Sequence, residues 1–136
     1  MQITGGELYY FPKFDILKDG EKLYYELFRN ISRNSGSEVM IKTRCSKGMS
    51  VTEFFGGFGL RESVELQLSA IDADKTFGFS LRNDQKILEN SNVFVQIAVF
   101  YTDVYGERRL RIFNQSFQVT NNLNIYFKSC NSENFV

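Results

Sequence analysis

Two carboxylates one residue apart are the first candidates for chemistry in this sequence. Asp72 and Asp74 lie in the stretch AIDADKTF. Carboxylates at this spacing can hold a divalent cation or serve a sugar-nucleotide site. The stretch also joins two segments of alternating hydrophobicity, where aspartate commonly closes a turn by accepting hydrogen bonds from its own backbone. The position between the two segments favours the turn.

Three other stretches contain residue types found in catalytic or phosphate sites. Ser46 and Lys47, in RCSKG, are the types of a Ser-Lys pair, but their place at the end of a strand segment favours a turn. Cys45 alternates with apolar residues, which favours a packed side chain over a nucleophile. The glycines of FFGGFG, residues 54–59, lack the Lys and Ser/Thr of a P-loop and the dinucleotide-binding spacing, so this stretch is interpreted as a bend.

The composition excludes several classes of site. None of the 136 residues is histidine, so there is no histidine-based acid/base pair, no Ser-His-Asp triad and no histidine-ligated zinc. The 16 basic and 16 acidic side chains balance, which argues against nucleic acid as a partner, because nucleic-acid binding generally needs a basic field. Cys45 and Cys130 belong to no CxxC pair, and we expect no disulfide.

Basic residues nevertheless gather at two strand ends. If these ends meet in the fold, five cations form one patch suited to an anionic lipid surface or an acidic peptide. The alternative is a solvated face on which the cations alternate with acidic residues, namely Glu38, Asp103 and Glu107. The candidate contact residues are Arg44, Lys47, Arg108, Arg109 and Arg111.

The first elements that position these residues are a short strand and a helix. Residues 7–11, ELYYF, predict a strand that Pro12 ends, because proline cannot donate to a ladder. A helix is expected over about 20–33, with Asp19 as its N-cap and Gly36 as its stop. Its apolar side chains recur at helical spacing; they are Leu23, Tyr24, Leu27, Phe28 and Ile31.

From residue 38 the apolar period becomes two, which predicts strands with one buried and one wet face. The first strand places Val39, Ile41 and Thr43 on its buried face. Residues 93–101 are apolar on nearly both faces, which predicts a central strand. Residues 107–117 pair back to it across the turn DVYG. The other strand segments are 50–60, with a Gly-Gly break, 63–71 and 75–83.

In the hairpin strand 107–117, Leu110 and Ile112 point to one side and Arg109 and Arg111 to the other. A second helix begins near residue 121 with Thr120 or Asn121 as its cap. The order therefore predicts a mainly β fold, a β-sandwich of about six to eight short strands with flanking helices at both ends. The sequence shows neither a membrane-length apolar run nor a signal peptide, so we expect a cytoplasmic protein.

Several stretches together resemble one known family. They are TGGELYYFPKF, LFRNISRNSGSEVMIKTRCSKGMSV, FFGGF, AIDADKTF and VQIAVFYTDVYGERRLRIFNQSFQVT, and they run from about Thr4 to Phe127. The series closely resembles the cargo-adaptor subunit of the inner layer of the COPII vesicle coat. The most specific pieces are RCSKG and YTDVYGERRLRIFN. The sister subunit, which activates the coat's small GTPase, shares the architecture, but GGELYYFP and GERRLRI are nearer to the adaptor.

The resemblance implies a division into three parts. Residues 1–36 are expected to be the end of a trunk domain, 37–119 the β-sandwich domain and 120–136 the start of a helical domain. In the family, strands that precede the trunk help to complete the sandwich, and they are absent from this sequence. A bare sheet edge invites pairing between copies, so we expect self-association.

The resemblance also implies a function without catalysis. The chain is expected to be a structural and cargo-adaptor component of the COPII coat, in protein export from the endoplasmic reticulum to the Golgi. The implied partners are the GTPase-activating coat subunit, cargo sorting signals and the anionic endoplasmic reticulum membrane, and not nucleic acid. No cofactor is expected here, because the family's zinc finger lies outside this sequence. The implied location is cytoplasmic, peripheral on endoplasmic reticulum exit sites and COPII vesicles.

The basic strand belongs to the family-like stretch. The hypothesis is that Arg109 and Arg111 contact acidic lipid headgroups or an acidic sorting signal. Two other classes of function stay open. One is a free-standing β-sandwich module that binds protein or carbohydrate, which predicts an exposed aromatic platform and a self-contained fold. The other is an enzyme, for which the sequence offers no convincing nucleophile and base.

Overall fold

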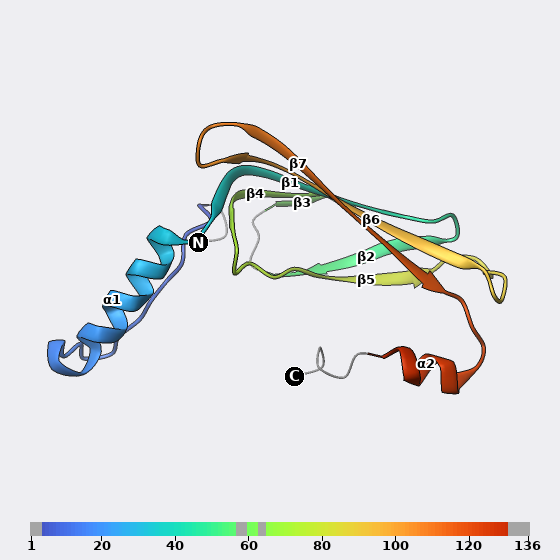
Figure 1. Cartoon of the computed structure of the whole chain (residues 1–136), viewed down its shortest axis with the longest axis horizontal. Helices are drawn as coiled ribbons and strands as arrows, with labels where there is room; N and C mark the ends of the chain where they lie inside the picture. The colour runs from blue at the N-terminus through green and yellow to red at the C-terminus, as the bar shows by residue number, and fades with distance from the viewer. Residues whose placement is uncertain (1–3, 57–59, 63–64, 131–136) are drawn as a thin grey trace.

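The computed structural model describes residues 4–56, 60–62 and 65–130. Strands dominate, and one helix stands at each end, so the predicted mainly β class is confirmed (Figure 1). The elements in chain order are α1 (Ile16–Ser32), β1 (Ser35–Cys45), β2 (Met49–Phe55), β3 (Leu60–Glu62), β4 (Glu65–Asp72), β5 (Gly78–Asn83), β6 (Asn92–Asp103), β7 (Arg108–Gln118) and α2 (Leu123–Ser129).

The strands form two antiparallel sheets of unequal size, one above the other in Figure 1. The larger sheet has the order β3-β4-β1-β6-β7, and the smaller one pairs β2 with β5. Two strands cannot cover five, because neighbouring strands lie about 4.8 Å apart across a sheet. Part of the inner face of the larger sheet is therefore left open, on the side of β7.

The core lies where the two sheets overlap. In β1 the buried and exposed positions alternate: Val39, Ile41 and Thr43 are 2%, 5% and 3% exposed, while Met40 is 40% exposed. This confirms the predicted faces of the first strand. The buried apolar residues that pack together are Val39, Ile41, Phe54, Leu66 and Leu68.

The hairpin β6–β7 forms as the sequence predicts. β6 lies between β1 and β7 and pairs with both, which explains why it is apolar on nearly both faces. The register sets Tyr101 opposite Arg109 and Val99 opposite Arg111. β7 is the edge strand, and each of its 11 residues is exposed.

The start of the chain differs from the prediction. Residues 7–11 form no strand, because a strand is stabilised by ladder hydrogen bonds and no described strand pairs with this segment. The helix begins at Ile16 rather than near residue 20, and Asp15 is its N-cap instead of Asp19. Asp15 Oδ1 accepts a hydrogen bond from the Leu17 N–H at 2.9 Å. The helix begins at the earlier of the two possible caps because each residue added to a helix forms one more backbone hydrogen bond.

The residues that end α1 and begin α2 also differ from the prediction. α1 ends at Ser32, in agreement with the predicted end near 33, but Gly36 is not its stop and is buried inside β1. The N-cap of α2 is Asn122 rather than Thr120 or Asn121, and its side chain accepts from the Asn124 N–H at 2.9 Å. No residue of either helix is buried. None of the described helices is long and apolar enough to cross a membrane.

Two sequence predictions fall partly outside the described residues. The bend expected over 54–59 begins as predicted, since β2 ends at Phe55, but 57–59 are not described. The start of the strand segment expected over 63–71 also lies outside them, since 63–64 are not described. In β4, Leu66 and Leu68 are 0% and 8% exposed while Gln67 between them is exposed, which agrees with a strand that has one buried and one wet face.

Candidate interaction sites

The paired carboxylates of AIDADKTF lie at the turn that follows β4. Asp72 Oδ1 accepts a hydrogen bond from the backbone N–H of Asp74 at 2.9 Å. The Asp72 carbonyl accepts another from the Lys75 N–H at 3.2 Å. These bonds confirm the turn interpretation. Within the described ranges, no group of three or more His, Cys, Asp or Glu side chains could hold a metal ion.

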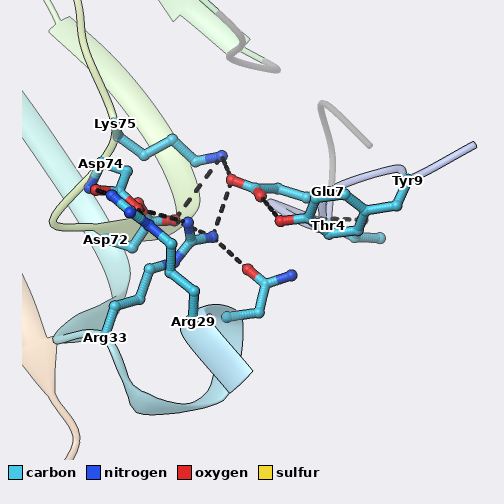
Figure 2. Close-up of polar contacts among 10 residues, drawn as sticks. Thr4, Glu7, Tyr9, Arg29, Arg33, Asp72, Asp74 and Lys75 are labelled. Carbon is cyan, nitrogen blue, oxygen red and sulfur yellow. Dashed lines mark hydrogen bonds and ion pairs between the residues drawn. The ribbon is translucent and has the colours of Figure 1, made fainter. Parts of the chain in front are cut away.

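The two carboxylates bind arginines of helix α1 (Figure 2). Arg29 forms a bidentate pair with Asp74, from Nε to Oδ2 at 2.8 Å and from Nη2 to Oδ1 at 2.7 Å. Arg33, the C-cap residue of α1, donates from Nη1 to Asp74 Oδ2 at 3.0 Å. Its Nη2 lies 3.0 Å from Asp72 Oδ2. The last turn of α1 is thus joined to the turn after β4 by charge-assisted hydrogen bonds.

The segment before α1 adds a third carboxylate. Glu7 Oε1 lies 2.9 Å from Arg33 Nη2 and 3.1 Å from Lys75 Nζ. Glu7 Oε2 accepts a hydrogen bond from the Tyr9 hydroxyl at 2.5 Å. The hydrogen bonds from Tyr9 and then Lys75 lower the pKa of Glu7 to about 2. We call the six charged residues the Arg33 cluster: Glu7, Arg29, Arg33, Asp72, Asp74 and Lys75.

The Arg33 cluster is balanced and partly shielded from solvent. It contains three cations and three carboxylates, and the side chains of Arg33 and Asp72 are only 12% and 10% exposed. Hydrogen bonds from Arg29 and then Arg33 hold the pKa of Asp74 well below its usual range. The cluster was not predicted from the sequence. A usable signal was the spacing of Arg29 and Arg33, which are one helical turn apart and therefore share a face.

The hairpin arginines divide between the two faces of β7. Directly paired residues of a sheet point to the same side. Ile41 pairs with Val99 and Val99 with Arg111, so Arg111 points to the side of the core. Arg109 shares that side, because it lies two residues away on the same strand. This side of β7 is the part of the inner face that the smaller sheet leaves open.

Two of the hairpin arginines are paired within the chain. Arg109 donates to Asp103 Oδ2 at 2.5 Å and to Glu107 Oε2 at 2.6 Å. Arg108, on the opposite face, donates to Glu38 Oε2 at 3.0 Å. Its guanidinium carbon also lies 4.1 Å from the centre of the Phe100 ring. The acidic partners are those that the solvated-face alternative named.

Arg111 is held differently. Its Nε donates to the Tyr101 hydroxyl at 3.1 Å, and over the described ranges no carboxylate forms an ion pair with it. An open groove of about 530 Å³ lies beside it on the inner face. The groove is lined by cations, carboxylates and apolar side chains together, among them Asp72, Val99, Asp103, Arg109, Arg111 and Phe113.

The structure does not bring the five candidate cations together. β1 and β7 each run antiparallel to β6, so they run parallel to each other and their opposite ends cannot meet. Arg44 lies opposite Gln96, whereas Arg108 lies opposite Thr102, six residues farther along β6. At about 3.4 Å per residue, the two groups are roughly 20 Å apart along the sheet. Arg44 and Lys47 are exposed at the end of β1 that lies away from Arg108.

The remaining chemical candidates have structural roles. Ser46 Oγ accepts from the Phe94 N–H at 2.7 Å and joins the turn after β1 to β6, in line with the turn interpretation. Burial raises the pKa of the Cys45 thiol, which keeps it protonated and weakens it as a nucleophile. Cys45 and Cys130 are both free, as expected.

Comparisons with known proteins agree on one family. Residues 36–120 match the model described as the Sec23/Sec24 beta-sandwich domain. The chain is 40% identical over 126 residues to Protein transport protein SEC24 B of Arabidopsis thaliana, covering 93% of this chain and 12% of that protein. It is 33% identical over 132 residues to Protein transport protein Sec24D of Homo sapiens, covering 97% and 13%.

A solved structure gives the same result in three dimensions. The crystal structure of the human COPII-coat protein Sec24c superimposes with a TM-score of 0.90 and 29% sequence identity. The match covers 98% of this chain and 18% of that one. The sequence therefore spans a small part of the length of the relatives it matches.

Proposed function

This chain belongs to the Sec23/Sec24 family, whose β-sandwich domain it carries, and we propose that it is a structural and cargo-adaptor part of a COPII coat. In this role it acts in protein export from the endoplasmic reticulum to the Golgi. The observation that carries the proposal is the match of 98% of the chain to the human COPII-coat protein Sec24c at a TM-score of 0.90.

The proposed role is mechanical rather than catalytic, and needs no cofactor within this chain. We divide the chain into the end of a trunk domain (1–36), the sandwich (37–119) and the start of a helical domain (120–136). The matched range 36–120 supports this division. A free-standing binding module would be self-contained, whereas α1 and α2 bury no residue here. Helices with uncovered apolar stripes are typical of segments that pack on further structure.

Arg109 and Arg111 are the proposed contacts for an acidic sorting signal. The support is geometric: both lie on the uncovered inner face, and the groove beside them is a concave surface lined in part by apolar side chains, which suits a peptide better than a flat bilayer. Arg108 is engaged by Glu38 and Phe100 on the other face. Arg44 and Lys47 are the proposed contacts for an anionic membrane, about 20 Å away along the sheet.

The other proposed partners are the GTPase-activating coat subunit and a second copy of this chain. The coat subunit would be met through trunk surfaces outside this sequence, on the cytoplasmic side of endoplasmic reticulum exit sites and on COPII vesicles. The second copy would pair through the exposed edge of β7.

Immunoprecipitation from the source cells tests the proposal. Antibodies raised to this chain are used, the recovered proteins are identified by mass spectrometry, and antibodies from unimmunised animals serve as the control. We expect recovery of the GTPase-activating coat subunit. Recovery of this chain without any coat protein, from cells in which the coat itself is intact, would overturn the assignment.

A further inference from the structure

We infer that the Arg33 cluster is an ionic clamp that fixes the direction in which helix α1 projects from the sandwich. This inference concerns how two parts of the chain are held together and does not depend on the proposed coat function. It follows from three observations: where α1 lies, what touches its base, and how Arg33 is placed in the cluster.

Helix α1 is not held by apolar packing against the sheets. Figure 1 shows α1 and the segment before it as an arm at one end of the sandwich, at the left of the view. None of the 17 residues of α1 is buried. The apolar side chains along one face of α1 are exposed, with Leu27, Phe28 and Ile31 exposed by 55%, 58% and 76%. Within this sequence, apolar burial, the usual force that orients a helix, therefore does not set the angle between α1 and the sandwich.

The contacts at the base of the arm are mainly polar, beside a close approach of the Gly5 backbone to Ala70 of β4. Only Arg33 and Asn34 separate α1 from β1, and the Asn34 carbonyl accepts from the Ala73 N–H at 3.0 Å. A link of two residues fixes the position of the helix end relative to β1. It does not fix the angle between the helix and the sheet, which depends on other contacts. The charged ones among them are the ion pairs of the cluster, which join both halves of the arm to the turn after β4 (Figure 2).

Arg33 is the hub of the cluster. It touches all three carboxylates, at 2.9 Å from Glu7, 3.0 Å from Asp72 and 3.0 Å from Asp74. Its side chain is 12% exposed, so solvent screens these contacts less than it screens surface pairs. Without Arg33, three carboxylates would face each other with fewer cations between them, and their repulsion would push the arm away from the sandwich.

The clamp has a diagnostic response to salt. The screening length falls from about 10 Å at 0.1 M salt to about 3 Å at 1 M, which weakens ion pairs. Apolar docking of α1 would not weaken in this way. The exposed Arg29–Asp74 pair therefore weakens as salt rises, whereas the shielded contacts of Arg33 weaken less. The clamp loosens in part at high salt, and an apolar contact does not.

The test is a distance measurement by double electron–electron resonance on the whole chain. Both cysteines are replaced (C45A, C130A), and spin labels are placed at Glu21→Cys on α1 and at Lys86→Cys beyond β5, two exposed positions. We expect one narrow distance distribution at low salt that broadens at about 1 M sodium chloride. Arg33→Met should be broad at both salt concentrations.

Matched controls make the outcome decisive. Arg82 forms an exposed ion pair with Asp84 near the end of β5, and Arg82→Met should keep the narrow distribution. Circular dichroism checks that each variant is folded, and Asp74→Asn replaces Arg33→Met if the latter is not. The clamp is refuted if the distribution of Arg33→Met, or of its replacement, stays as narrow as that of the parent chain at low salt.

Discussion

At the scale of single residues, Glu7 gives the clearest prediction of a pH dependence. Its pKa in the folded chain is lowered from 4.5 to about 2 by Tyr9, Lys75 and Arg33, which all face it. A group whose folded pKa is depressed stabilises the protein above its unfolded pKa and loses that contribution as the pH falls through the folded value. The contribution of Glu7 is thus complete above about pH 4.5 and lost towards pH 2.

Urea unfolding of the parent chain and Glu7→Gln between pH 7 and pH 2 measures this contribution. Solvent partly screens the ion pairs of Glu7 with Arg33 and Lys75. We therefore expect Glu7→Gln to be less stable than the parent chain by about 1 kcal/mol at pH 7. Other carboxylates titrate in both chains, so only the difference between them reports Glu7. A difference as large at pH 2 as at pH 7 would contradict the assignment.

Arg109 and Arg111 give a prediction about binding. Reversing both charges, Arg109→Glu with Arg111→Glu, should weaken the binding of a glutamate-rich peptide by tenfold or more, since two charge-assisted hydrogen bonds would be replaced by repulsion between like charges. Fluorescence anisotropy of a labelled peptide measures this, and a glutamine-rich peptide controls for charge.

The other two cations supply the matched control. Arg44→Glu with Lys47→Glu changes the net charge equally but lies roughly 20 Å from the groove, so peptide binding should persist. If instead the hairpin reversals spare the peptide and abolish binding to phosphatidylserine vesicles, the arginines serve the membrane. If they change neither, the basic strand is only a solvated face.

At the scale of elements, β4 and β7 should contribute unequally to stability. Leu66 of β4 is completely buried, while Leu110 of β7 is 59% exposed. Leu66→Ala should cost about 2–5 kcal/mol, the usual loss for a buried leucine that leaves a cavity. Leu110→Ala should cost less than about 1 kcal/mol. Equal losses in urea unfolding would mean that the outer face of β7, on which Leu110 lies, is packed as tightly as the core.

The sequence predicted those elements whose signal is local. The alternation in β1 and the hairpin β6–β7 follow from a period of two between neighbouring residues, and both are confirmed. The prediction of a strand at 7–11 is wrong because a strand also needs a neighbouring strand to pair with, and no local pattern indicates whether one is present. The start of α1 was misplaced because Asp15 and Asp19 are equally good caps by residue type.

The candidate sites could be predicted less well, because they depend on strand order. The five-cation patch assumed that the end of β1 meets the start of β7, but β6 lies between them and makes them parallel. The Arg33 cluster joins residues 41 and 45 positions apart. No rule of local spacing connects such residues, whereas each of its parts, a turn and a helix end, is visible in the sequence.

At the scale of the whole molecule, the unequal sheets lead to the prediction of self-association. The edge strand β7 is exposed along 11 residues and contains neither proline nor glycine. Such an edge invites pairing, although three arginines protect its first half. Two copies of β7 paired antiparallel about Phe113 would set Arg109 against Phe117 and Arg111 against Gln115, so the arginines would avoid each other. A twofold pair of this kind is self-complementary and closes as a dimer.

Sedimentation velocity over a wide concentration range tests this arrangement. We expect a dimer to appear as the concentration rises. Phe113→Lys would place two like charges opposite each other at the twofold axis, which is unfavourable across a strand pair, and should shift the chain to monomer. Leu110→Lys adds the same charge but faces Ser116 of the other copy in this register, so the dimer should persist. A monomer at the highest concentration would rule out pairing, and equal loss with both variants would rule out this register.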